Sequence, residues 1–496
     1  MGSWLATFCP GRSRWSPGVG ASIAGRVRPL VLKAPPSCHR MVGTITVAVA
    51  LAMSAGAGAQ TPPLHLAEAV TSAWMRYPGM TAAQQAATLA VAQADLARTA
   101  FWPNAGLAAQ WDRATDNATL GLSFGSPLPG ISGTVPASDY SQRSAWTSAA
   151  GLYFTWEIAD FGRRAANVRY FQNLAQQAGD QAAVVRLQVG AHAADAYLTV
   201  LAAGQQVRVR TADVRRWADL AKIVEALVGQ QLRPGADRSR AQAELAAARI
   251  RASDAGRDLE SARASLAEAL GLAPGQPLPP LAALTGLPPE VPAKNRATPP
   301  QVRVRQDAVA AAQAQQKEVA RSALPRWYAL GSAYGRGSGV LAAGRLAPGL
   351  TGLAPTTAAN WAVGLGVDFS FTRWRAQRSQ SVAAKAQLTQ EQARQRQTEG
   401  QLHRAQQQAA ADWNAARTVA RESPIGLAAA QAGERQARVR YQTGLASLVD
   451  LANAEQLLAQ ADSDNALGQL QVWRALVETA YAAGDLQPVL TAAQGH

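Results

Sequence analysis

The chain has 496 residues, of which 48% are hydrophobic but only 6% aromatic, and alanine supplies much of the hydrophobic share. This composition excludes a disordered chain and favours long helices packed through small side chains over a large aromatic core. The formal net charge is +15, but the arginines are spread out, with no dense basic run beside stacking aromatics. A nucleic-acid-binding protein is therefore not indicated.

The N-terminal segment has the features of a leader for export. Basic residues precede an apolar run at 42–55 that is too short to span a bilayer, and a small-residue cleavage site ends at Ala59. We therefore predict a signal peptide or leader over residues 1–59. The sequence leaves open whether translation starts at Met1 or at Met41.

The residues around this boundary limit the chemistry of the mature chain. Both cysteines, Cys9 and Cys38, lie within the leader, so neither a disulfide framework nor thiol chemistry is expected after its removal. Gln60 stands where an N-terminal lipid anchor would need a cysteine. No later segment is long and apolar enough to predict a transmembrane helix.

The rest of the sequence indicates a tandem duplication. An offset of 213 residues aligns "GLYFTWEIADFGRR" with "GLGVDFSFTRWRAQ" and also aligns "LRPGADRSRAQAEL" with "LASLVDLANAEQLL". Nearer the start of each half the offset is 222, and it pairs Pro78 with Pro300 and Pro103 with Pro325. The predicted repeats cover 60–270 and 300–486, with a proline-rich linker at 271–299 and a tail at 487–496.

Each repeat is expected to have the same order of elements. In the first repeat a helix is followed by a strand, a long loop, a second strand and a long helical hairpin, at 64–101, 104–112, 113–145, 146–158 and 160–270. In the second repeat the corresponding ranges are 300–324, 326–335, 336–360, 361–372 and 373–482. A proline after the first helix of each repeat ends that helix.

The first helix of each predicted hairpin, at 160–230 and 373–442, has about 70 residues and would be about 100 Å long. Apolar residues seven apart form a coiled-coil-like seam at Phe161, Val168, Ala175, Ala182, Val189 and Ala196. Pro424 lies inside the second long helix, so we expect a kink there.

The strands alternate between apolar residues and small or polar residues. One face of the last strand carries Trp361, Val363, Leu365, Val367, Phe369 and Phe371, and one face of the second strand carries Trp146, Ala150, Leu152, Phe154, Trp156 and Ile158. This pattern and length are typical of outer-membrane barrel strands, although a small soluble sheet packed on helices is an alternative. Tryptophans in or beside the strands are the expected membrane-interface aromatics: Trp102, Trp111, Trp146, Trp156, Trp327, Trp361 and Trp374.

Four strands cannot close a barrel, and open edges in lipid would leave backbone groups without partners. Three chains would supply twelve strands. The opening "LAEAV…YP", the "WP" or "LP" before each first strand, "WEIADFGRR" and "RYQTGLASLVDLANAEQLL" are similar to the motifs of the TolC-type outer-membrane efflux family. The resemblance covers essentially residues 60–486.

This resemblance implies a mainly α protein with a membrane β-barrel. It implies a homotrimer whose 12-stranded barrel contacts outer-membrane lipid and continues as an α-helical barrel across the periplasm. A periplasmic adaptor protein and an inner-membrane pump of the RND or ABC type are the implied partners. The implied function is a passive exit duct for small molecules such as drugs or metals. A type I protein-secretion duct and a soluble periplasmic coiled-coil scaffold remain alternatives.

The family resemblance also suggests residues at the tips of the hairpins. The implied adaptor-docking residues are Gln231, Leu232, Asp237, Tyr441, Gly444 and Leu445. The Gly-Leu pair at 444–445 is altered to Gln-Leu at 231–232, and Gly444 is also what an ordinary turn would need. Ala446 stands where the family has an arginine that pairs with the aspartate at position 237, so a different or looser gate is expected.

The family's acidic constriction is represented by Asp450 and Asn453. Three copies of Asp450 would form a ring of negative charge in a pore, and Asn453 would form a neutral ring. A surface helix aspartate is the alternative reading of Asp450.

No enzyme is expected. "GLSFG" (121–125) matches a nucleophile elbow, but it lies in a predicted loop rather than between a strand and a helix. The five histidines have no metal-ligand spacing, so neither a metal nor another cofactor is predicted.

Overall fold

The computed structural model describes residues 62–115, 144–284, 286–289, 298–339, 349–355, 360–370 and 372–494. The expected leader, its signal peptide, both cysteines and the "GLSFG" motif lie outside the described residues. Within the described part of the chain, no helix combines the length and the apolar character needed to cross a membrane.

The first repeat begins with two helices and a short 3-10 turn, continues through two strands and ends in a long helical hairpin. In order these elements are α1 (Leu66–Arg76), α2 (Pro78–Arg98), η1 (Thr99–Phe101), β1 (Asn104–Thr115), β2 (Ser144–Ala159), α3 (Arg163–Gly229) and α4 (Gly235–Ala269). The second repeat follows the same order with α5 (Pro300–Arg321), β3 (Arg326–Ser338), β4 (Asn360–Asp368), α6 (Arg373–Gln442), α7 (Leu448–Ala483) and a further helix, α8 (Gln487–Gln494).

Three local expectations need correction. The single helix predicted over 64–101 is broken at Tyr77, which has an extended backbone because Pro78 restricts the residue before it and starts α2. The predicted tail instead contains α8, which buries Val489 and Leu490 against the rest of the chain. The fourth strand was expected to run to residue 372 but ends at Asp368, and Phe371 lies outside the described residues.

Pro424 lies inside α6, which continues through it as one helix of 70 residues. The kink predicted there remains a prediction. The seam predicted along α3 is partly present, because Val168, Val189 and Ala196 are buried. Phe161 is not part of it: this residue precedes α3, has a φ of 53° and is 57% exposed.

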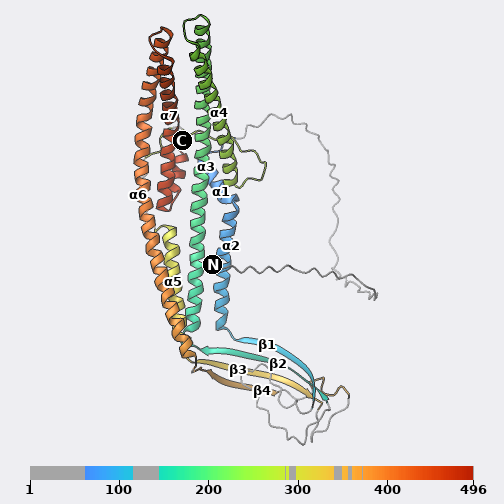
Figure 1. Cartoon of the computed structure of the whole chain (residues 1–496). Helices are drawn as coiled ribbons and strands as arrows, with labels where there is room; N and C mark the ends of the chain where they lie inside the picture. Colours follow the sequence, from blue (N-terminus) through green and yellow to red (C-terminus); the bar gives the residue numbers. More distant parts are fainter. Residues whose placement is uncertain are drawn as a thin grey trace, which may run out of the picture. The chain divides into compact units, whose positions relative to one another are not determined.

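The four strands form one antiparallel sheet in the order β1-β2-β3-β4 (Figure 1). The register aligns Leu107, Leu152, Ala333 and Trp361 in one row across the sheet, so the apolar face expected from single strands is continuous. Three of these side chains are well exposed: Leu107 (75%), Leu152 (62%) and Trp361 (78%). The chain therefore presents a broad apolar surface that its own residues do not cover.

β3 contributes mainly glycine and alanine to this face. A Cβ atom added at Gly331 would lie 2.2 Å from the ring of Phe154, so the phenylalanine on β2 occupies the space above β3. No strand among the described residues pairs with the outer edge of β1 or of β4. The sheet is thus open at both edges.

A buried ion pair joins β2 to the start of α3 within the "WEIADFGRR" motif. Asp160 accepts hydrogen bonds from the backbone N–H groups of Gly162 (3.0 Å) and Arg164 (2.6 Å), and from the Arg164 side chain (3.1 Å). Burial raises the pKa of Asp160, but these bonds outweigh it and lower the pKa overall. Arg164 also donates to the carbonyl of Ala100 and lies 4.9 Å from the Phe101 ring, which fixes the strand-to-helix corner.

The helices form two long hairpins, α3–α4 and α6–α7, whose turns lie at the same end (Figure 1). α3 packs against α7 as well as against α4, so the hairpins share a seam. Near the turns this seam contains a buried apolar cluster that includes Trp217, Leu220, Val224, Leu448 and Leu451. This apolar cluster holds the two hairpins together close to their turns.

Candidate pore and hairpin-turn site

The two hairpin turns have the same backbone geometry. After α3, the N–H of Leu232 donates to the carbonyl of Leu227 (2.9 Å), and after α6 the N–H of Leu445 donates to the carbonyl of Arg440 (2.8 Å). This is the Schellman end of a helix, which needs one residue with positive φ. Gly444 takes that position with φ of 84°, and in the first turn Gln231 takes it with φ of 58°.

Leu232 and Leu445 directly follow these residues in the chain. Leu232 is 64% exposed and Leu445 is 73% exposed. Each turn therefore exposes a leucine at the equivalent position. Their expected role in docking an adaptor remains a prediction.

Arg233 links the first turn to the second. Its guanidinium lies 4.4 Å from the centre of the Tyr441 ring and donates hydrogen bonds to the carbonyl oxygens of Tyr441 and Ala446. Sequence reasoning missed this residue. The signal was present, because the 213-residue offset aligns Arg233 with Ala446, the position where the expected arginine is missing.

Tyr441 is fully buried and also connects the two hairpins near their turns. Its hydroxyl donates to Asp237 at 3.1 Å, across the seam between α6 and α4. Burial, and then the charge of Asp237, raise the pKa of Tyr441 to about 12. The turns are therefore tied by a neutral tyrosine and by Arg233, and Asp237 has a tyrosine partner where an arginine was expected.

Asp450 lies in the first turn of α7, on its exposed side, with Asn453 one helical turn further on. Its carboxylate accepts hydrogen bonds from the hydroxyl (2.8 Å) and the backbone N–H (3.0 Å) of Ser447, which is a capping box. The Ser447 hydroxyl, and then its N–H, lower the pKa of Asp450, so the group stays charged. Asp450 therefore caps its own helix, and the place of Asp450 and Asn453 in a pore constriction remains a prediction.

The expected interface tryptophans lie on or near the sheet, and several have large exposed areas. These are Trp102 (77%), Trp111 (57%), Trp156 (42%), Trp327 (42%) and Trp361 (78%). Trp146 is half-buried, and the guanidinium of Arg113 lies 5.8 Å from its ring centre. The side chain of Trp374 lies outside the described residues. Their placement at membrane interfaces remains a prediction.

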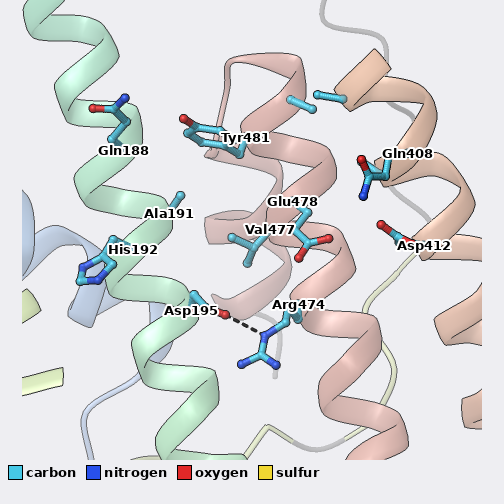
Figure 2. Close-up of a pocket in the computed structure, with 13 residues that line it drawn as sticks. Gln188, Ala191, His192, Asp195, Gln408, Asp412, Arg474, Val477, Glu478 and Tyr481 are labelled. Atoms are coloured by element: carbon cyan, nitrogen blue, oxygen red, sulfur yellow. Dashed lines mark hydrogen bonds and ion pairs between the residues drawn. The ribbon is translucent and has the colours of Figure 1, made fainter. Parts of the chain in front are cut away.

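A pocket of about 520 Å³ lies between α3, α6 and α7 (Figure 2). Its polar residues include Asp195, Asp412 and Glu478, and Arg474 pairs with Asp195 at 2.7 Å. Burial, followed by the charge of Asp412, raises the pKa of Glu478. The described residues contain no group of three or more side chains arranged to hold a metal ion.

Known proteins resemble this chain in sequence and in fold. Residues 70–272 match the family of outer membrane efflux proteins. No curated protein sequence matches the chain.

Several solved structures share the fold over most of their length. The outer membrane protein VceC from Vibrio cholerae is 16% identical with a TM-score of 0.72, over 85% of this chain and 96% of VceC. The CmeC outer membrane channel of Campylobacter jejuni is 14% identical with a TM-score of 0.72, over 84% and 85%. The outer-membrane channel OprN is 20% identical with a TM-score of 0.69, over 84% and 89%.

The fold is thus that of outer-membrane channels, and the expected fold class is confirmed. Residues 70–272 are thus similar in sequence to outer membrane efflux proteins.

Proposed function

We propose that three copies of this chain close one duct, with the four strands of each copy forming a third of a twelve-stranded barrel. The observation that carries the proposal is the open sheet with a continuous apolar face. Leu107, Leu152 and Trp361 expose that face, and the edges of β1 and β4 have no partner strand among the described residues. In lipid, a row of unpaired backbone groups is costly, and closure by further copies removes it.

The helical hairpins extend this duct away from the sheet. We infer that the exposed Leu232 and Leu445 at the turns meet a periplasmic adaptor protein, which connects the duct to an inner-membrane pump. The duct itself is passive, and the pump supplies the energy. The cargo consists of small molecules such as drugs or metals, with protein secretion as the second candidate.

A soluble periplasmic scaffold fits the observations less well. The apolar row across four strands would face water in such a protein, and surfaces of that kind mark interaction or membrane sites. In an outer-membrane protein the same row would face lipid.

The assembly is tested on the exported protein extracted from outer membranes in detergent. Light scattering after size exclusion is expected to give the mass of three chains, and addition to planar bilayers is expected to give discrete conductance steps. A monomer without conductance would contradict the proposal. Recovery of the protein in the periplasmic soluble fraction would support the scaffold instead.

A further inference from the structure

A cluster of charged side chains lies where the two hairpins meet, away from the turns. Arg216 on α3 lies 3.3 Å from Glu455 and 3.0 Å from Asp462, both on α7. Arg438 on α6 lies 2.9 Å from Glu455 and 2.6 Å from Glu434. Arg216 therefore connects the first hairpin with the second, and Glu455 is the group that both arginines share.

The cluster extends into α4 through a second buried carboxylate. Arg251 lies 3.3 Å from Asp213, which also lies 3.8 Å from Arg216. We name the group the seam cluster; it consists of Asp213, Arg216, Arg251, Glu434, Arg438, Glu455 and Asp462. Four carboxylates face three guanidinium groups, so the fully ionised cluster carries one excess negative charge.

This excess charge is withdrawn from water. The side chains of Glu455 and Asp213 are each only 1% exposed, and Glu434 is 9% exposed. Leu451 and Ala452, one turn before Glu455, belong to the buried apolar cluster of the seam. An uncompensated charge in such surroundings is costly.

Hydrogen bonding leaves a place for one proton. Glu455 Oε1 accepts from Arg438, whereas Glu455 Oε2 and Arg216 Nε lie 3.3 Å apart and neither makes a hydrogen bond. The groups that face Glu455 are Arg216 and Asp213 from α3 and Arg438 and Glu434 from α6, with Asp462 on its own helix. Oε2 therefore lies beside Arg216 without accepting a hydrogen bond, so a proton on this oxygen would replace none of the hydrogen bonds of Glu455.

We propose that the seam cluster is a proton-stabilised clasp: one proton on Glu455 cancels the excess charge and holds α3 against α7, and its loss loosens the seam. The inference rests on the proposed duct, because the two hairpins carry the turns at its periplasmic end. The device would widen that end as the periplasm becomes more alkaline.

The direction of the pKa shift of Glu455 agrees with a proton bound in the clasped form. Burial and then the charge of Glu434 raise its pKa to about 7, although Arg438 and Arg216 act in the opposite direction. A carboxyl group with a raised pKa binds its proton more tightly when buried than when exposed to water. The clasped form therefore has its full advantage below about pH 4.5 and loses it progressively as the pH rises through about 7.

The size of the effect follows from linkage. If Glu455 has an ordinary pKa of about 4.5 in the released form, the ratio of released to clasped protein rises roughly tenfold between pH 6 and pH 8. Replacing Glu455 with glutamine keeps the shape and removes the charge, so the ratio should no longer depend on this titration.

The clasp is tested by hydrogen exchange of the intact protein in detergent. The readout is the exchange rate of the α3 and α7 segments around Arg216 and Glu455, corrected for the intrinsic pH dependence of exchange. The wild-type protein is expected to exchange about tenfold faster at pH 8 than at pH 6. Glu455→Gln should exchange slowly at both values. Glu260→Gln, at an exposed residue of α4, should behave as the wild type.

A second variant keeps the test valid if Glu455→Gln does not fold. Asp462→Asn leaves three carboxylates for three guanidinium groups, so the midpoint of the pH dependence should move below that of the wild type. Wild-type exchange without pH dependence, or an unchanged profile in both variants, would overturn the clasp. Because exchange needs no pore, pH-dependent exchange without conductance would retain the clasp and refute the duct.

Discussion

Leu365 and Gly364 are neighbours on opposite faces of β4, and they offer a matched test of which face meets lipid. Leu365 is 72% exposed on the apolar face, and its partner on β3 is Ala329. A Cβ atom added at Gly364 would have no atom within 4 Å, so a larger side chain fits there. Leu365→Arg and Gly364→Arg therefore add the same charge one residue apart.

The two variants should differ strongly. An arginine on the lipid face near the middle of a barrel costs about 2–4 kcal/mol, whereas one on the face that lines a channel is tolerated. Because the proposed trimer carries three copies, Leu365→Arg should destabilise it by roughly 6–12 kcal/mol if the copies act independently.

The assay is urea unfolding after insertion into phospholipid vesicles, together with the amount of each variant recovered from the outer membrane. We expect Gly364→Arg to insert like the wild type, with an altered conductance, and Leu365→Arg to fail or to unfold at much lower urea. Equal stability of the two variants would refute the assignment of the faces.

Three further predictions concern the turns. Gln231→Gly should raise the free energy of unfolding by about 1 kcal/mol, since glycine adopts the left-handed backbone at lower cost, and chemical denaturation would measure it. Asp450→Asn should change single-channel conductance and the block of the channel by multivalent cations. Ser447→Ala removes the cap but keeps the charge of Asp450, so it should lower the free energy of unfolding by about 1 kcal/mol and leave the block unchanged. Identical block in both variants would exclude Asp450 from the pore. Arg233→Ala should increase conductance by releasing one turn from the other, and Arg233→Lys, which cannot reproduce the planar stacking, should restore it only in part.

Much of the fold could be predicted because its signals are local or repeated. The alternation from Trp361 to Val367 depends on neighbouring residues, and the duplication is visible as a constant offset. The break at Tyr77 was also readable, since Pro78 restricts the residue before it, but the surrounding helical pattern was given more weight. α8 was missed because its eight residues form a helix chiefly by burying Val489 and Leu490 against the chain.

The site was less accessible to sequence reasoning. The capping box at Ser447 and Asp450 has a readable spacing, and it supplies a structural role that the pore assignment did not consider. The contact of Arg216 with Glu455 has no such signal, because the partners belong to different repeats and meet only through tertiary packing. Pairs of this kind follow from the seam between the hairpins, not from spacing along the chain.

The duplication explains why the two turns have the same backbone conformation, although their side chains make different contacts. Asp237 and Asp450 occupy equivalent positions, yet Asp237 accepts a hydrogen bond from Tyr441 of the other hairpin and Asp450 caps its own helix. Arg233 occupies the position equivalent to Ala446, and its side chain donates to two backbone carbonyls of the second turn. Within the described residues, the first turn contributes Arg233 and Asp237 to these contacts, and the second contributes the Tyr441 side chain. If the proposed duct widens at this end by separating the two turns, the contacts of Arg233 and Asp237 are the ones that must break, whereas the bonds of Asp450 to Ser447 lie within one turn and can persist.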